Sequence, residues 1–159
     1  MKSKATNKWM AEVFRRVGEW FLDLPEGAEI NMNEMSATAE IYDGKCCGSP
    51  ACVGGWLAVL YRTPTHYGTS NRFFEDGANE FAKELGFENN RRLSDWAEAN
   101  PSIWGNDFGW DMFYKERAYS EGGKEYDNNT ITVKAVGDKF VAVAGRLEKK
   151  AVIEHFKDR

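Results

Sequence analysis

The chain has 159 residues, the size of one ordinary domain and too short for two comfortable ones. Hydrophobic residues make up 42% of it and charged residues 29%, which excludes intrinsic disorder, collagen and coiled coil. We therefore expect a single globular domain over residues 1–159. The longest apolar run, residues 51–61, is shorter than the ~20 residues that cross a bilayer. Residues 1–20 lack the apolar core of a signal peptide, so the sequence predicts a cytoplasmic protein.

Charge is uneven along the chain. The total of 21 Lys and Arg against 25 Asp and Glu argues against a general nucleic-acid binder. Residues 1–16 carry five basic and one acidic side chain, and residues 134–159 carry seven and four. The middle carries nine and twenty, a net charge of −11 between residues 17 and 133. This pattern fits an acidic surface that pairs with its own basic termini, or an acidic face that docks on a basic partner.

The first predicted element is an amphipathic helix over residues 9–24. Apolar side chains recur there at helical spacing, charged residues fill the other face, and Pro25 ends the pattern. Residues 26–45 lose this period and are expected to be irregular. Within them, Thr38 to Tyr42 alternate as a strand or an extended arm would.

Three further helices follow. Ser49 is a predicted N-cap and Pro50 occupies the first helical position, where its missing N–H costs nothing. The helix from Ala51 to Tyr61 is apolar almost all round, so we expect it to be the central, most buried one. A third helix is predicted over Asn71 to Leu85 and a fourth over Asn90 to Ala99, which ends before a proline.

An aromatic stretch comes next. Its members are Ile103, Trp104, Phe108, Trp110, Phe113 and Tyr114. One interpretation is that these side chains close the core under a loop. The other is an exposed aromatic patch for a partner, with Trp104, Phe108 and Trp110 as its contact residues.

The last segment decides the fold class. Read as strands, residues 132–136 and 139–144 flank Gly137-Asp138 and form a β-hairpin. Read as a helix, the same region carries one apolar stripe that persists for three turns after a plausible N-cap at Thr132. We favour a helix over residues 133–149. The prediction is a mainly α fold, a single-domain bundle of five or six helices with a buried central helix; the alternative is α+β with a small C-terminal β-hairpin.

Residues 46–56 (CCGSPACVGGW) have the character of a motif. Cys47 lies just before the predicted turn and Cys52 in the first helical turn, so both sulfurs can point into one small space as buried, reduced thiols. Gly54 and Gly55 would permit close backbone contact with the first helix. A disulfide is geometrically conceivable, but a cytosolic chain keeps its thiols reduced.

A metal site and a catalytic site are two chemical alternatives for these cysteines. The spacing of three cysteines and two histidines matches no metal site, so we expect no metal, and the absence of nucleotide-binding motifs predicts no cofactor. A cysteine-dependent hydrolase or transferase would use Cys52, which the helix dipole activates, with Cys47 and His66 beside it. His66 is only fourteen residues further on and His155 lies near a frayed end, so catalysis is the less favoured interpretation.

The cysteine segment resembles short, uncharacterised phage and bacterial proteins with the pattern C-G-[ST]-x-x-C-[IV]-x-G-[WH]-A. Ile30-Asn31-Met32 and residues 82–87 match segments that precede and follow it in those proteins. The similarity covers about residues 9–97; it departs from the pattern at Leu57, where a small residue is usual, and adds Cys46. The resemblance implies a phage or prophage setting, hence the host cytosol, and no particular chemistry.

The functional prediction is binding without catalysis. We expect a phage-type accessory protein that contacts a host or defence protein through an acidic surface. Glu75, Glu80 and Glu84 are its first candidates, because the apolar stripe of the third helix turns them to solvent. The expected partner is a protein with a basic surface, such as one that binds nucleic acid. No direct contact with nucleic acid or membrane is expected.

Overall fold

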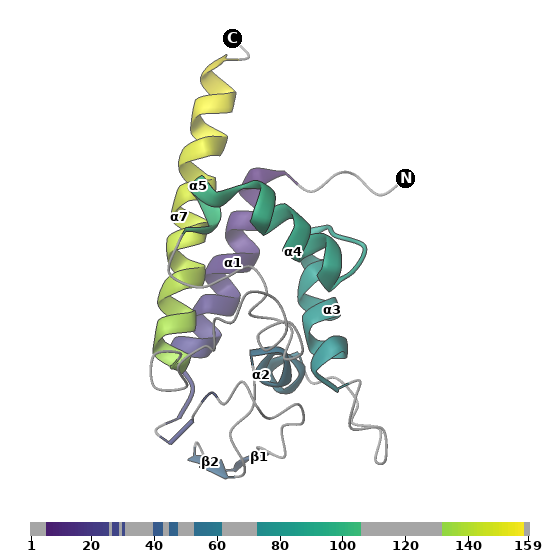
Figure 1. The fold of residues 1–159 in the computed structure, drawn as a ribbon. Helices are drawn as coiled ribbons and strands as arrows, with labels where there is room; N and C mark the ends of the chain where they lie inside the picture. Colours follow the sequence, from purple (N-terminus) through teal and green to yellow (C-terminus); the bar gives the residue numbers. More distant parts are fainter. Residues whose placement is uncertain are drawn as a thin grey trace.

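The structure is a computed structural model that describes residues 6–25, 27, 28, 30, 40–42, 45–47, 53–61, 73–105 and 132–157. For residues 40–42, 45–47, 55 and 73–76 it describes the backbone alone. Within these ranges it contains helices α1 (Asn7–Leu22), α2 (Val53–Leu60), α3 (Phe73–Leu85), α4 (Asn90–Ala99), α5 (Pro101–Trp104) and α7 (Val133–Lys157), with strands β1 (Glu40–Tyr42) and β2 (Lys45–Cys47) (Figure 1). The predicted mainly helical bundle is confirmed.

The C-terminal segment is a helix, so the alternative hairpin around Gly137-Asp138 is not supported. Thr132 is its N-cap: its Oγ1 accepts a hydrogen bond from the Ala135 N–H at 3.0 Å. The helical stripe through Val136 and Phe140 is fully buried, which two short strands would split between opposite faces. The helix runs to Lys157, beyond the predicted end at residue 149.

The expectation of irregular structure over residues 26–45 is wrong at the paired strands. β1 and β2 pair antiparallel, with Glu40 opposite Cys47 and Tyr42 opposite Lys45. Of the alternating stretch that begins at Thr38, the part from Glu40 to Tyr42 is a strand. The backbone of Cys46 and Cys47 therefore belongs to β2.

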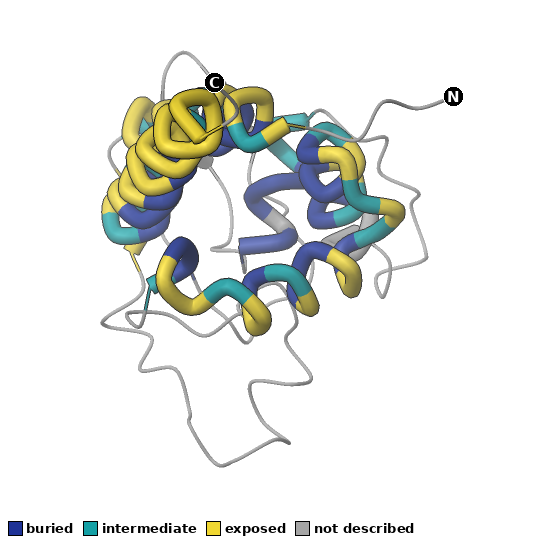
Figure 2. The backbone as a smooth tube through the Cα atoms, turned by 90° about the horizontal axis from the view of Figure 1, so that it is seen from above, coloured by how far each residue is buried: buried dark blue, intermediate teal, exposed yellow. Residues whose placement is uncertain are grey.

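The helices are arranged around one core. α1 and α7 run antiparallel along each other's length, and α2 packs against α3 (Figure 1). Buried residues line the inner sides of these helices and exposed residues the outer sides (Figure 2). Trp56 and Leu57 of α2 are fully buried, which confirms the predicted burial of this helix at these positions.

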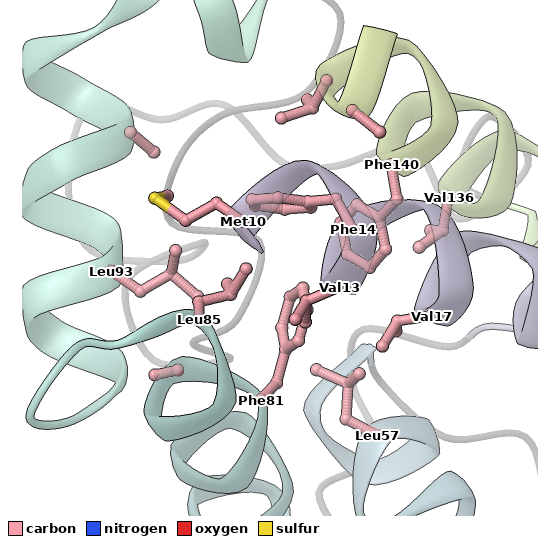
Figure 3. Close-up of a cluster of buried hydrophobic side chains, with 14 of the residues drawn as sticks. Met10, Val13, Phe14, Val17, Leu57, Phe81, Leu85, Leu93, Val136 and Phe140 are labelled. Carbon is pink, nitrogen blue, oxygen red and sulfur yellow. The ribbon is translucent and has the colours of Figure 1, made fainter. Parts of the chain in front are cut away.

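Phe14 lies where the elements meet. Its ring contacts Phe81 of α3 edge-on at 5.3 Å between centroids and Phe140 of α7 at 5.6 Å (Figure 3). Trp96 of α4 stacks on it at 6.1 Å and Trp104 of α5 approaches at 6.3 Å. Aromatic pairs at these spacings add to the stabilisation that burial provides. One side chain of α1 thus joins four other helices.

Glycines set the distance between helices at two crossings. A Cβ atom added at Gly77 of α3 would lie 2.2 Å from the Ala58 nitrogen and 2.5 Å from the Gly54 carbonyl oxygen of α2. The missing Cβ of Gly77 therefore permits a close backbone contact between α3 and α2 at Gly54, whereas the sequence predicts a close contact of Gly54 and Gly55 with the first helix. At the α1–α7 crossing, a Cβ at Gly18 would lie 2.9 Å from the Gly137 carbonyl oxygen.

Two glycine substitutions test this geometry. Gly77→Ala should lower the free energy of unfolding by about 3 kcal/mol or more, because the added methyl group meets backbone atoms that move only if α2 and α3 separate. Gly145→Ala should raise it by about 1 kcal/mol, because the methyl group there enters open space and alanine favours the helix. Urea unfolding of both variants measures the difference. A Gly77→Ala variant as stable as the native chain would contradict the close crossing.

Candidate functional site

The contact residues predicted from the sequence differ in how far the structure exposes them to solvent. Glu80 is exposed on α3, as predicted. Glu84 is only partly exposed and is held by other side chains. The side chain of Glu75, the side chain of Cys47, and all of Cys52, His66, Phe108 and Trp110 lie outside the part of the chain that the structure describes.

Glu84 is the centre of a polar network between α1, α3 and the end of α2. The Tyr61 hydroxyl donates a hydrogen bond to Glu84 Oε1 at 2.6 Å, and Arg16 of α1 forms an ion pair with the same oxygen. The indole N–H of Trp9 donates to the Glu84 carbonyl oxygen at 2.7 Å. The Arg16 guanidinium also lies over the Trp20 ring, 5.3 Å from its centroid.

The network alters the acid–base properties of its members. Burial, followed by the hydrogen bond to Glu84, raises the pKa of Tyr61 far above its ordinary value. Burial of Arg16 opposes its charge, but the hydrogen bond and the charge of Glu84 outweigh this and raise the pKa of Arg16. Glu84 therefore fastens α1 and Tyr61 to α3. It is not the free surface carboxylate that the sequence predicts.

Trp104 is 2% exposed, so the prediction that its ring contacts a partner is wrong. The Lys139 ammonium, itself on a side chain that is 2% exposed, lies 4.3 Å from the centroid of the Trp104 ring. It also donates to the Trp104 carbonyl oxygen at 2.8 Å, and Arg146 donates to the Ile103 carbonyl oxygen at 2.7 Å. At Ile103 and Trp104, the aromatic stretch closes the core, which was the first of the two interpretations.

Exposed charges segregate between the helices. The first group comprises α1 to α4 together with the residues that follow α1 or join α3 to α4. Its exposed acids are Glu12, Glu19, Asp23, Glu80, Glu88, Asp95 and Glu98. Its exposed bases are Lys8, Lys83, Arg91 and Arg92. On α7 the balance is reversed: the exposed acids are Asp138, Glu148 and Glu154, and the exposed bases are Lys134, Arg146, Lys149, Lys150 and Lys157. Taken together, the described exterior of α1, α3, α4 and these adjoining residues has more exposed acids than bases, and α7 has more exposed bases than acids.

The end of α7 carries a surface that sequence reasoning missed. Val152 is 54% exposed, Ile153 48% and Phe156 65%. The spacing of Val152 and Phe156, one helical turn apart, was a usable signal. The prediction ended the helix at residue 149, before these side chains.

Among the residues that the structure describes, no group of three or more His, Cys, Asp or Glu side chains could hold a metal ion. None of the helices in the same set has the length and apolar character needed to span a bilayer. No protein-family model matches the chain, and neither a curated protein nor a solved structure matches it. The resemblance to phage proteins therefore stays a prediction.

The raised pKa of Tyr61 predicts a pH-dependent stability difference. Above the ordinary tyrosine pKa of 10.0, the unfolded chain loses the phenol proton while the folded chain retains it. The stability that Tyr61 contributes is complete below this pH and declines above it. The difference in unfolding free energy between the native chain and Tyr61→Phe should therefore shrink between about pH 9 and 11. Urea unfolding in that range measures it; a constant difference would contradict the network.

Proposed function

We propose that the protein acts by binding a protein partner that has a basic surface. The observation that supports this best is the charge of the exterior formed by α1, α3, α4 and the residues that follow α1 or join α3 to α4, where seven exposed carboxylates outnumber four exposed cations. Facing charges of opposite sign speed diffusional encounter and discriminate against wrong partners. We name this exterior the acidic surface; it includes Glu80, Glu88 and Glu98.

The acidic surface consists of the carboxylates that remain free after internal pairing. Glu84 contributes little to it, because Arg16 and Tyr61 already compensate its charge. Asp95 lies within 3.8 Å of Arg92 on α4, an exposed pair that stabilises weakly and leaves both groups accessible. Glu80, in the middle of α3, is the carboxylate that the sequence predicts and that the structure leaves exposed.

The resemblance to phage proteins implies a phage or prophage setting, and binding to a host or defence protein fits that setting. A small accessory protein with an acidic surface can occlude the basic surface of a host or defence protein, such as one that binds nucleic acid. No described residue favours the alternative of a cysteine-dependent hydrolase or transferase over binding.

Charge reversal tests the acidic surface. A partner is first captured from host lysate on the immobilised native chain and identified by mass spectrometry, and its association rate is then measured at several salt concentrations. Glu80→Lys and Glu88→Lys should each slow association roughly threefold or more and weaken the salt dependence, with unchanged thermal unfolding.

Asp138→Lys is the matched control, because it changes the net charge equally but lies on α7. If Glu80→Lys, Glu88→Lys and Asp138→Lys all slow association by the same factor, net charge alone governs binding and the acidic surface is not the contact. Unchanged association for all three variants would also contradict the proposal.

A further inference from the structure

The end of α7 projects from the helix bundle (Figure 1). Its last turns extend beyond α1 and α5 (Figure 1). Upstream, Val143 and Leu147 face the core and are fully buried. At about 100° per residue, Phe156 lies about 180° round the helix from Leu147. The exposed apolar side chains at this end thus face away from the body of the protein.

Three exposed lysines lie near these side chains: Lys149 and Lys157 are within about 100° of Phe156 round the helix, and Lys150 borders this side. Between Lys139 and Lys157, the only acids in the sequence are Glu148 and Glu154, and both contact α1. Glu148 forms an ion pair with Arg15 at 2.7 Å, and Glu154 Oε2 accepts a hydrogen bond from the Asn7 amide at 2.9 Å.

Both carboxylates are exposed but paired with α1, so the outward side presents three lysines beside three apolar side chains. These six residues are Lys149, Lys150, Val152, Ile153, Phe156 and Lys157, and we call them the basic apolar face.

The antiparallel packing of α1 and α7 adds further positive charge at this end. The start of α1 lies beside the end of α7, as the contact between Asn7 and Glu154 shows. Lys8 is exposed there. The start of α1 therefore adds one exposed lysine beside the lysines at the end of α7.

The chemistry of the face limits what can cover it. A two-fold contact with a second copy would place Lys149 and Lys150 against their own counterparts, which is unfavourable. A nucleic acid would satisfy the lysines through its phosphates but leave Val152, Ile153 and Phe156 in water.

An anionic bilayer satisfies both kinds of side chain. Its headgroups attract lysines, and the boundary of its acyl chains accepts apolar groups from a helix that lies in the surface plane. A straight helical face that points away from the protein body suits a planar surface of this kind.

We propose that the basic apolar face of α7 binds the protein to membrane surfaces that contain anionic lipids. This activity is independent of the acidic surface, which lies on α1, α3 and α4. It differs from the sequence expectation of no membrane contact, because that expectation rested on the lack of a spanning segment and the helix was predicted to end before Val152. The two surfaces would together hold a basic partner protein near a membrane.

Vesicle binding tests the proposal with a defined probe. The full chain is sedimented with vesicles of phosphatidylcholine alone, and with vesicles of equal parts phosphatidylcholine and phosphatidylglycerol. We expect binding to the mixed vesicles, weak binding to phosphatidylcholine, and loss of binding as salt increases.

Variants then separate the two components of the face. Lys149→Glu with Lys150→Glu should weaken binding to mixed vesicles by roughly a hundredfold. Ile153→Ser with Phe156→Ser should weaken it by roughly tenfold. All four positions are exposed, and the helical circular dichroism and thermal unfolding should be unchanged.

Two matched controls lie on other elements. Lys83→Glu removes an exposed lysine from α3, and Leu22→Ser removes an exposed apolar side chain from the other end of α1. Both should retain vesicle binding.

Three outcomes would overturn the proposal. The first is equal binding to both vesicle compositions, the second is equal loss in the controls, and the third is no binding to either composition. If a partner captured from lysate depends on Ile153 and Phe156 while vesicles do not bind, the face docks on a protein and the lipid assignment is wrong. If charge reversal on the acidic surface does not slow association with a partner, the vesicle result does not change, so the two proposals can be refuted separately.

Discussion

The packing of aromatic rings around Phe14 is the contact on which the rest of the fold depends. Phe14 is fully buried and touches rings that come from α3, α4, α5 and α7. Phe81 and Phe140 also contact each other at 5.2 Å, so the three rings form a closed set (Figure 3). Edge-on and tilted contacts of this kind restrict the relative rotation of the helices as well as their distance. A bundle whose helices meet at one such point has little freedom to repack one helix without moving the others.

Close contacts between helices at glycines, together with the buried Lys139, also hold the helices around Phe14 in place. Gly18 and Gly137 let α1 and α7 approach closely, and Gly77 does the same for α3 against α2. Lys139 is enclosed in the core, where burial of a charge is costly unless polar groups surround it. Its bond to the Trp104 carbonyl satisfies an oxygen at the end of α5. This contact therefore anchors the short α5 helix to α7, and it fixes where the aromatic stretch enters the core.

Periodic patterns allowed much of the fold to be predicted, and long-range pairing explains most of what was missed. The apolar stripe after Thr132 identified a helix, because burial of a continuous apolar stripe stabilises a helix more than the strand preference of β-branched residues stabilises a hairpin. A strand at Glu40–Tyr42 was one of the alternatives for the stretch that begins at Thr38, but β2 and its pairing with β1 were missed, although Asp43-Gly44, a favoured two-residue hairpin sequence, separates the two strands. The role of Glu84 depends on Arg16 and Tyr61, which lie far from it in sequence, so no local pattern could have indicated it.

Internal pairing also decides which charges are left for partners. The sequence places a net +4 on residues 1–16, but Arg15 and Arg16 are engaged with Glu148 and Glu84. The same pairs compensate the charges of Glu148 on α7 and Glu84 on α3. The described exterior is left with an excess of carboxylates on the acidic surface and with three exposed lysines on the end of α7. Because like charges repel, a surface complementary to one of these regions is disfavoured at the other. Under the two proposals, the pairs that hold α1 in place also determine which charges remain on the acidic surface and on the end of α7.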